Sequence, residues 1–192
     1  MVDKILLQIA KDSILSRFDK SYTPQRDEVV EGHPFLLEKR ATFVTLHYDK
    51  NLRGCIGSLM AHRTLFDDVS SNAVSAAFKD TRFMPLEERE LSHLTLEVSV
   101  LSIPKLLEYE DFDDLVGKIR VNVDGLILQH GGYRGTFLPQ VWKQLPNPKI
   151  FLEHLSMKAG ANPGIFNEHP QIYTYQVEAI EDRFDEIPSL QG

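Results

Sequence analysis

The stretch Leu52–Gly57, with the sequence LRGCIG, combines residue types that could do chemistry and contains the only cysteine of the chain. A thiolate can act as a nucleophile when a cation or a positioned base stabilises it, and Arg53 stands two residues before Cys55. Glycine lets another backbone or a ligand approach closely, so Gly54 and Gly57 could open such a site. The same pattern also fits a plain strand in which Cys55 is a small apolar residue of the core.

Three charged residues are the next candidates for this site. Arg53 could clamp a carboxylate or phosphate, or form an ion pair with Glu97 or another carboxylate, because its planar fork suits both tasks. Glu97 could be a general base or a metal ligand, although such a residue is more often solvated or paired with arginine. Arg82 could contact an anion, but its place after a helix break favours a role in anchoring a loop.

A fourth candidate, Arg134, stands among glycines at 131, 132 and 135. These residues could form an anion-binding nest of amide groups, or simply the turn of a hairpin. They lack the spacing of a phosphate-binding loop or a dinucleotide fingerprint. None of the seven histidines has the spacing of a zinc motif, and there is no GxSxG nucleophile elbow. We therefore expect no dedicated metal site and no bound cofactor.

The composition limits the classes of partner and the compartment. The 192 residues carry a formal net charge of −7, which argues against nucleic-acid and anionic-membrane partners, since these select for clustered lysine and arginine. A single cysteine cannot form an internal disulfide, which fits a reducing compartment. The N-terminus has no signal-peptide pattern, and no apolar run approaches the roughly 20 residues that span a bilayer. We expect a cytoplasmic protein.

The apolar spacing predicts the elements that would position these residues. A helix is expected over residues 2–18, followed by a polar connection from 21 to 32. A β-rich run over 40–48 and a turn at 49–51 predict a hairpin that places Cys55 on or beside a strand, next to a bulge. Strand pairs mixed with helices, without regular βαβ alternation, predict an α+β fold with an antiparallel sheet flanked by helices. Further helices are expected over 64–79 and from 111, 139 and 149, and further strands over 94–100, 120–130, 133–138 and 172–180.

The chain resembles the AMMECR1 domain family, known in bacteria and archaea as protein A of the AmmeMemoRadiSam system. The resemblance covers roughly residues 6–180, and its most specific motif is Leu52–Gly57. The supporting motifs stand in the right order: Asp80–Phe83 with Pro85 and Leu86, Glu97–Leu101, Arg134 with Leu138–Trp142, and Lys158–Gly160.

The resemblance implies a fold and a setting rather than a reaction. It implies that residues 1–192 form a single AMMECR1-type domain of two unequal lobes, with the motif residues near a cleft between them. The smaller lobe is expected around residues 45–90. It also implies a shared pathway with a Memo-like protein and a radical SAM protein. Many relatives carry a second cysteine in the helix before Lys158–Gly160, and its absence here makes a mechanism with two thiols doubtful.

Two hypotheses follow for the function. In the first, the protein is a cytoplasmic accessory or regulatory protein that binds a small ligand or a partner in the cleft. The alternative is a cysteine-dependent enzyme with Cys55 as nucleophile or thiol carrier. The binding residues in the first hypothesis are Arg53, Gly54, Gly57, Arg82, Glu97 and Arg134.

Overall fold

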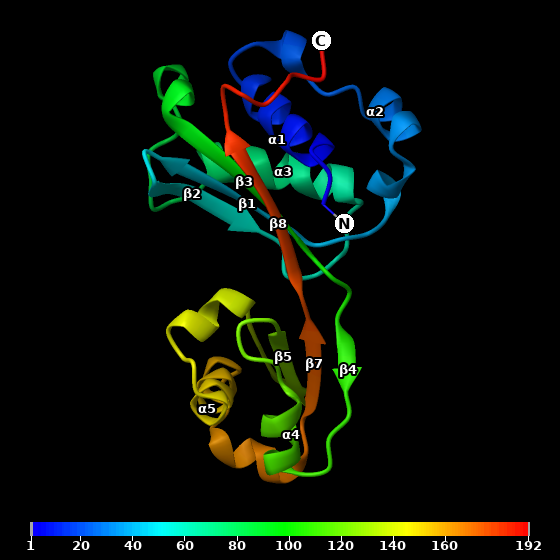
Figure 1. The fold of residues 1–192 in the computed structure, drawn as a ribbon, viewed down its shortest axis with the longest axis vertical. Helices are drawn as coiled ribbons and strands as arrows, with labels where there is room; N and C mark the ends of the chain where they lie inside the picture. Colours follow the sequence, from blue (N-terminus) through cyan, green and yellow to red (C-terminus); the bar gives the residue numbers. More distant parts are fainter. Residues whose placement is uncertain (1, 192) are drawn as a thin grey trace. The chain divides into compact units, whose positions relative to one another are not determined.

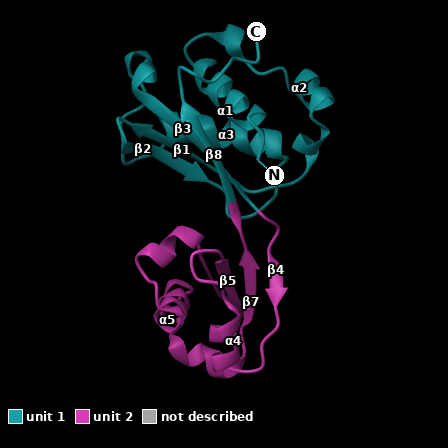
Figure 2. Cartoon of the chain, in the orientation of Figure 1, with its two compact units in different colours: residues 1–101, 178–192 teal, residues 102–177 magenta. Residues whose placement is uncertain are grey.

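The computed structural model describes residues 2–191, which form two compact units (Figures 1 and 2). The first consists of the residues up to Leu101 together with those from Glu178 onward, and the second of Ser102–Val177. Each contains helices and its own four-stranded sheet, so the predicted α+β class is confirmed. Residues 45–90, expected to form a smaller lobe, all lie inside the first unit.

The sheet of the first unit has the strand order β2-β1-β3-β8 (Figure 1). The predicted hairpin is confirmed, because β1 and β2 pair antiparallel around a turn where Asp49 and Lys50 have φ angles of 45° and 71°. Positive φ at both central residues matches the right-handed twist of the strands. The strands are β1 (Thr42–Tyr48), β2 (Asn51–Gly57), β3 (Leu94–Leu101) and β8 (Val177–Arg183).

Helices α1 (Ile5–Leu15) and α3 (Leu65–Phe78) cover one face of this sheet. Alternation along β1 buries Val44 and Leu46 completely against these helices, and removing such side chains from water stabilises the fold by about 1.5–3 kcal/mol each. The opposite face of β1 carries half-buried side chains. Helix α3 begins as predicted, since the Thr64 hydroxyl accepts the Asp67 N–H.

The predicted connection from 21 to 32 is wrong in part, because this stretch contains α2 (Arg26–Gly32). Short 3-10 helices precede and follow it at η1 (Lys20–Tyr22) and η2 (Pro34–Leu37). The acidic first turn of α2 favours a helix start, and Val29 and Val30 pack against the core of the unit. Most residues of α2 are charged, so the sequence shows no clear apolar periodicity that would predict this helix.

The sheet of the second unit has the order β4-β7-β5-β6. Its core lies between this sheet and the helices, around the fully buried Trp142 and Phe151. The predicted single strand over 172–180 is wrong, because β7 ends at Tyr175 and the chain then enters β8 of the other sheet. The elements are β4 (Lys105–Leu107), α4 (Phe112–Lys118), β5 (Gly125–His130), β6 (Tyr133–Phe137), η4 (Pro139–Lys143), α5 (Pro148–Lys158), η5 (Pro163–Glu168) and β7 (Gln171–Tyr175).

The two ends of the second unit are hydrogen-bonded to each other. The Ser102 N–H donates to the Gln176 carbonyl at 2.8 Å, and the Gln176 N–H donates to the Ser102 hydroxyl at 2.8 Å. The Gln176 side chain also donates to Asp124, a buried carboxylate that Arg120 contacts through several N–H groups. Burial alone would raise the pKa of Asp124, but the bonds from Arg120 and Gln176 outweigh this and lower it.

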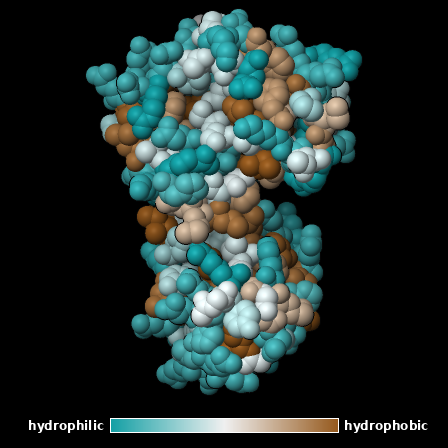
Figure 3. Space-filling model, turned by 180° about the vertical axis from the view of Figure 1, so that it is seen from behind, coloured by the Kyte–Doolittle hydropathy of each residue, from teal (hydrophilic) through white to brown (hydrophobic). Residues whose placement is uncertain are grey.

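The face drawn in Figure 3 is largely hydrophilic, with apolar side chains among the polar ones. The most exposed large apolar residue in the described part of the chain is Met84, at 80%. No helix within residues 2–191 is both long and apolar enough to span a lipid bilayer.

Helix α3 and strand β2 approach each other at Gly54. A Cβ atom at this position would lie 2.1 Å from the Ala76 carbonyl oxygen, so no larger residue fits without moving the helix. A Cβ at Gly57 would likewise lie 2.3 Å from the Phe43 ring. Both glycines of the LRGCIG motif are therefore required by packing inside the first unit.

We expect Gly54→Ala to lower the free energy of unfolding by about 3 kcal/mol, because a backbone carbonyl cannot yield as a side chain can. Chemical denaturation monitored by circular dichroism measures this change. The matched control is Gly32→Ala at the end of α2, where a Cβ meets nothing within 4 Å. This control should change stability by less than about 1 kcal/mol. Equal effects of the two substitutions would contradict the packing requirement.

Candidate functional site

Cys55 lies on β2 directly after an irregularity in the strand pairing. Leu46 of β1 pairs with Gly54 and His47 pairs with Leu52, so Arg53 is an extra residue on β2. This confirms the predicted bulge next to the motif cysteine. Because the bulge breaks the alternation, Arg53 and Cys55 do not share a face in the way a regular strand would require.

Cys55, Thr45 and Glu97 form a row across β2, β1 and β3. They lie on the face opposite to the buried Val44 and Leu46, and all three are half-buried. The Thr45 hydroxyl donates to the Cys55 sulfur at 3.3 Å. Glu97 accepts a hydrogen bond from Ser99 at 3.2 Å. The sheet thus brings the predicted residues Cys55 and Glu97 onto one surface, separated by a threonine.

The outer edge of β2 is covered at Cys55 by Asp80 and Arg82. The Cys55 N–H donates to the Asp80 carboxylate at 3.0 Å, and Arg82 Nη2 donates to the Cys55 carbonyl at 3.3 Å. These side chains satisfy backbone groups that a neighbouring strand would otherwise bond, which protects the edge from pairing with another chain. The Cys55 backbone groups therefore point away from β1, which is the geometry that brings the Thr45 and Cys55 side chains close.

Asp80 holds the guanidinium of Arg82 in a fixed orientation. Arg82 Nε and Nη2 donate to the two oxygens of Asp80 at 3.0 and 2.7 Å, and the Phe83 ring lies 5.5 Å from the guanidinium carbon. These bonds from Arg82 hold the pKa of Asp80 well below its ordinary value, and the bond to Asp80 raises the pKa of Arg82. The Asp80 side chain is 5% exposed and that of Arg82 is 56% exposed. Arg82 is thus charged, oriented and open to solvent.

Arg53 has a different environment from Arg82. Its guanidinium forms a bidentate ion pair with Glu90 at 2.7 and 3.0 Å and donates to the Met84 carbonyl at 2.9 Å. The Arg53 side chain is only 13% exposed. The bonds from Arg53 lower the pKa of Glu90. This geometry favours the ion-pair alternative for Arg53, with Glu90 rather than Glu97 as the carboxylate.

Arg134 lies in the second unit, on β6, opposite Gln129 of β5. Gly131 and Gly132 form the turn between these strands, which agrees with the hairpin alternative. A Cβ at Gly135 would lie 2.8 Å from the Ala159 backbone nitrogen, so this glycine lets β6 pack against the end of α5. Arg134 is therefore not among the residues that the first sheet gathers around Cys55.

Sequence reasoning did not include Asp80, Thr45 or Glu90 among the site residues. Asp80 belongs to the motif Asp80–Phe83, but its spacing from Arg82 gave no sign of an ion pair. The pairing of Thr45 with Cys55 depends on the register of the hairpin, which the turn at 49–51 sets. Among residues 2–191, no group of three or more His, Cys, Asp or Glu side chains is placed to hold a metal ion.

Comparisons with known proteins agree with the fold. The AMMECR1 family model matches residues 7–180. Protein MJ0810 of Methanocaldococcus jannaschii is 36% identical over 168 residues, covering 85% of this chain and 84% of the relative. A protein of Sulfolobus acidocaldarius is 38% identical over 200 residues, covering 99% and 87%. The crystal structure of PH0010 from Pyrococcus horikoshii superposes with a TM-score of 0.75 at 31% identity, covering 96% of this chain and 93% of that one.

We expect Asp80→Asn to lower the free energy of unfolding by about 1–2 kcal/mol at pH 7, a value reduced because Arg82 is partly exposed. The folded state lowers the pKa of Asp80, so its stabilisation is present above the unfolded value of about 4 and is lost as the pH falls below it. Urea denaturation between pH 7 and pH 3 measures the difference between wild type and variant. This difference should stay constant down to about pH 5 and shrink below pH 4.

The control for this series is Asp27→Asn, because Asp27 is fully exposed on α2. Its effect on stability should stay within about 0.5 kcal/mol at each pH. A difference for Asp80→Asn that does not change with pH would show that the lost contact is not electrostatic.

Proposed function

Because this chain belongs to the AMMECR1 family, we propose that it is an accessory protein that binds an anionic group of a ligand or partner through Arg82, beside Cys55. The anionic group is a carboxylate or a phosphate, which a guanidinium recognises through paired hydrogen bonds. The protein acts with Memo-like and radical SAM proteins in a modification pathway. The single observation that supports this function most strongly is the orientation of a half-exposed Arg82 by the buried Asp80.

An arginine held in this way is suited to binding. Asp80 occupies Nε and Nη2 of Arg82, and within the described residues Nη1 has no hydrogen-bond partner. A ligand oxygen can therefore reach Nη1 without breaking the Asp80 pair. Since the guanidinium is already fixed over Phe83, little side-chain entropy is lost on binding. Arg82 Nη2 is bonded to the Cys55 carbonyl, and Thr45 is bonded to the Cys55 sulfur, so these two residues would contact the rest of the ligand.

The environment of the thiol supports binding over nucleophilic catalysis. The Cys55 sulfur accepts its hydrogen bond from a threonine hydroxyl, which does not act as a general base at neutral pH. Glu97 lies in the same row but on the far side of Thr45.

One observation favours the alternative, a cysteine-dependent enzyme. Arg82 Nη2 donates to the Cys55 carbonyl at 3.3 Å, so a cation stands at the residue that would be the nucleophile. The loss of the second cysteine leaves only single-thiol chemistry open to such an enzyme.

We expect Arg82→Ala to weaken the complex with the Memo-like and radical SAM proteins of the same organism by about tenfold or more, because an oriented charge is lost. Biolayer interferometry with purified proteins measures this affinity. The matched control is Arg89→Ala, whose side chain is 81% exposed and lies outside the proposed site. Cys55→Ser should keep the affinity within about threefold. Unchanged affinity for Arg82→Ala, checked as folded by circular dichroism, would contradict the proposal.

We expect Cys55 to react with iodoacetamide several times more slowly in the native protein at pH 7 than in denaturant, because the residue is half-buried and bonded to Thr45. Mass spectrometry of the single thiol over time gives both rates. Rapid labelling of the native protein near neutral pH, faster than that of the denatured chain, would instead support the enzyme.

A further inference from the structure

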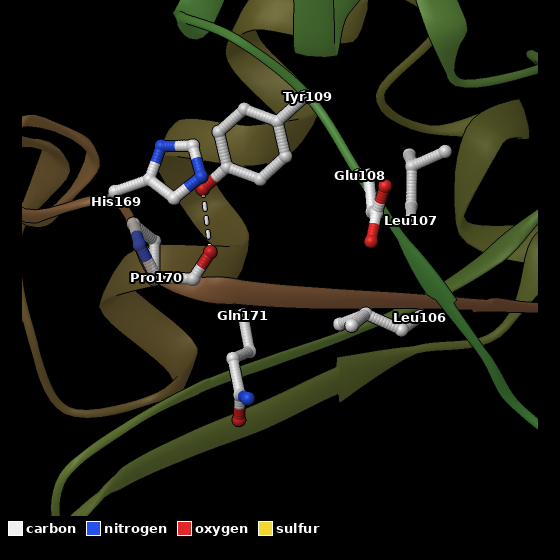
Figure 4. Close-up of a pocket in the computed structure, with 7 residues that line it drawn as sticks. All are labelled: Leu106, Leu107, Glu108, Tyr109, His169, Pro170 and Gln171. Atoms are coloured by element: carbon white, nitrogen blue, oxygen red, sulfur yellow. Dashed lines mark hydrogen bonds between the residues drawn. The ribbon is translucent and has the colours of Figure 1, made fainter.

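The second unit contains a hollow that the proposed function does not use (Figure 4). It has a volume of about 380 Å³ and forms where the chain leaves β4 and where it enters β7. In Figure 4, Tyr109 and His169 lie on one side of it, while Leu107 and Glu108 lie on the other. The remaining lining residues are Leu106, Pro170 and Gln171.

The aromatic side of the hollow is held rigidly. The His169 ring stacks on Tyr109 with centroids 4.2 Å apart and an interplanar angle of 24°. The Tyr109 hydroxyl donates to the Pro170 carbonyl, and burial raises the pKa of this tyrosine, so it stays a neutral donor. His169 is exposed and has a φ of 53°, which is uncommon for a residue other than glycine. The stack and the hydrogen bond place the two rings side by side along this wall.

The charge of the hollow is negative. Of the seven residues that line it, only Glu108 is acidic, and within the described chain its carboxylate has no ion-pair partner. Lys118, the nearby cation, donates to the Glu108 backbone carbonyl and forms an ion pair with Asp114. A carboxylate facing a flat ring and leucine side chains fits a cation on an apolar stem.

The hollow also adjoins a free sheet edge. Strand β4 is the edge strand of the sheet β4-β7-β5-β6. It pairs with β7 along one side, and no strand among residues 2–191 pairs with its other side. Leu106 on this strand and Ile103 just before it are 50% and 61% exposed. An extended polypeptide can hydrogen-bond such an edge while one of its side chains enters a pocket beside it.

We propose that the free edge of β4 and the adjoining hollow bind an extended polypeptide segment, with a lysine or arginine side chain placed between Glu108 and His169. The backbone of the segment pairs with β4, and its apolar side chains cover Leu106 and Ile103. This interaction is independent of Arg82 and Cys55, which lie in the other unit.

The test uses the full-length protein and a fluorescent, capped peptide of alternating valine and threonine with one central arginine. Fluorescence anisotropy should give a dissociation constant below about 1 mM at 0.15 M salt. Glu108→Gln should weaken binding roughly tenfold, because it removes the charge but keeps the shape. The matched control is Glu110→Gln, two residues further on and outside the hollow, which should change the affinity less than about twofold.

Two modified probes distinguish the parts of the proposal. A peptide with glutamate in place of the arginine, and a peptide N-methylated at alternate residues, should each bind at least about tenfold more weakly. No binding of the first peptide to folded protein at 1 mM would overturn the proposal. So would equal affinity for the glutamate peptide, or equal weakening by Glu108→Gln and Glu110→Gln. Free arginine that binds as tightly as the peptide would overturn the role of the strand edge.

Discussion

The close contact between Gly54 of β2 and the carbonyl of Ala76 determines much of the first unit. It fixes the distance of α3 from the sheet, and α3 ends only two residues later, at Phe78. The chain therefore leaves the helix beside the outer edge of β2, where Asp80 reaches the Cys55 N–H. Arg82 then reaches back to the Cys55 carbonyl. The absence of a side chain at Gly54 thus determines where the Asp80 carboxylate and the Arg82 guanidinium lie.

Two arginine–carboxylate ion pairs lie next to β2, and they differ in how far the arginine is exposed to solvent. Arg53 and Glu90 are 13% and 19% exposed, and their bidentate pair fastens the segment from Met84 to Glu90 onto the strand. In the second pair the aspartate is buried and the arginine is mostly exposed. The first pair is used mainly to hold a segment in place, whereas the second presents an exposed charged group that Asp80 orients.

The sequence predicted local features better than those that depend on distant contacts. The hairpin around Asp49, the cap at Thr64 and the bulge beside Cys55 depend on neighbouring residues, and they are confirmed. Helix α2 was missed because its stability comes from Val29 and Val30 packing on a core that no local pattern reveals. The continuous strand over 172–180 was wrong because β7 and β8 share one apolar run but join two sheets.

The sequence predicted which residues belong to the candidate site better than it predicted which side chains they contact. Cys55 and Arg82 were selected by residue type and spacing, and the fold joins them by a hydrogen bond. The partner of Arg53 could not be chosen between Glu97 and other carboxylates, since that choice depends on where η3 (Glu88–His93) lies against β2. The hollow beside β4 left no pattern in the sequence, because its residues come from two segments about sixty positions apart.

The hydrogen bonds that close Ser102 onto Gln176 have a consequence for the order in which the chain folds. The second unit is inserted between β3 and β8, so during synthesis it is made before β8 exists. Until then β3 has a vacant edge, and Asp12 of α1 lacks the C-terminal residues Ser189 and Leu190 that donate to it. Once folded, the second unit holds Ser102 against Gln176 and so brings the last segment of the chain close to the edge of β3. The ends of β3 and β8 are then joined by a folded unit rather than by a long flexible loop. This lowers the conformational entropy lost when β8 pairs with β3.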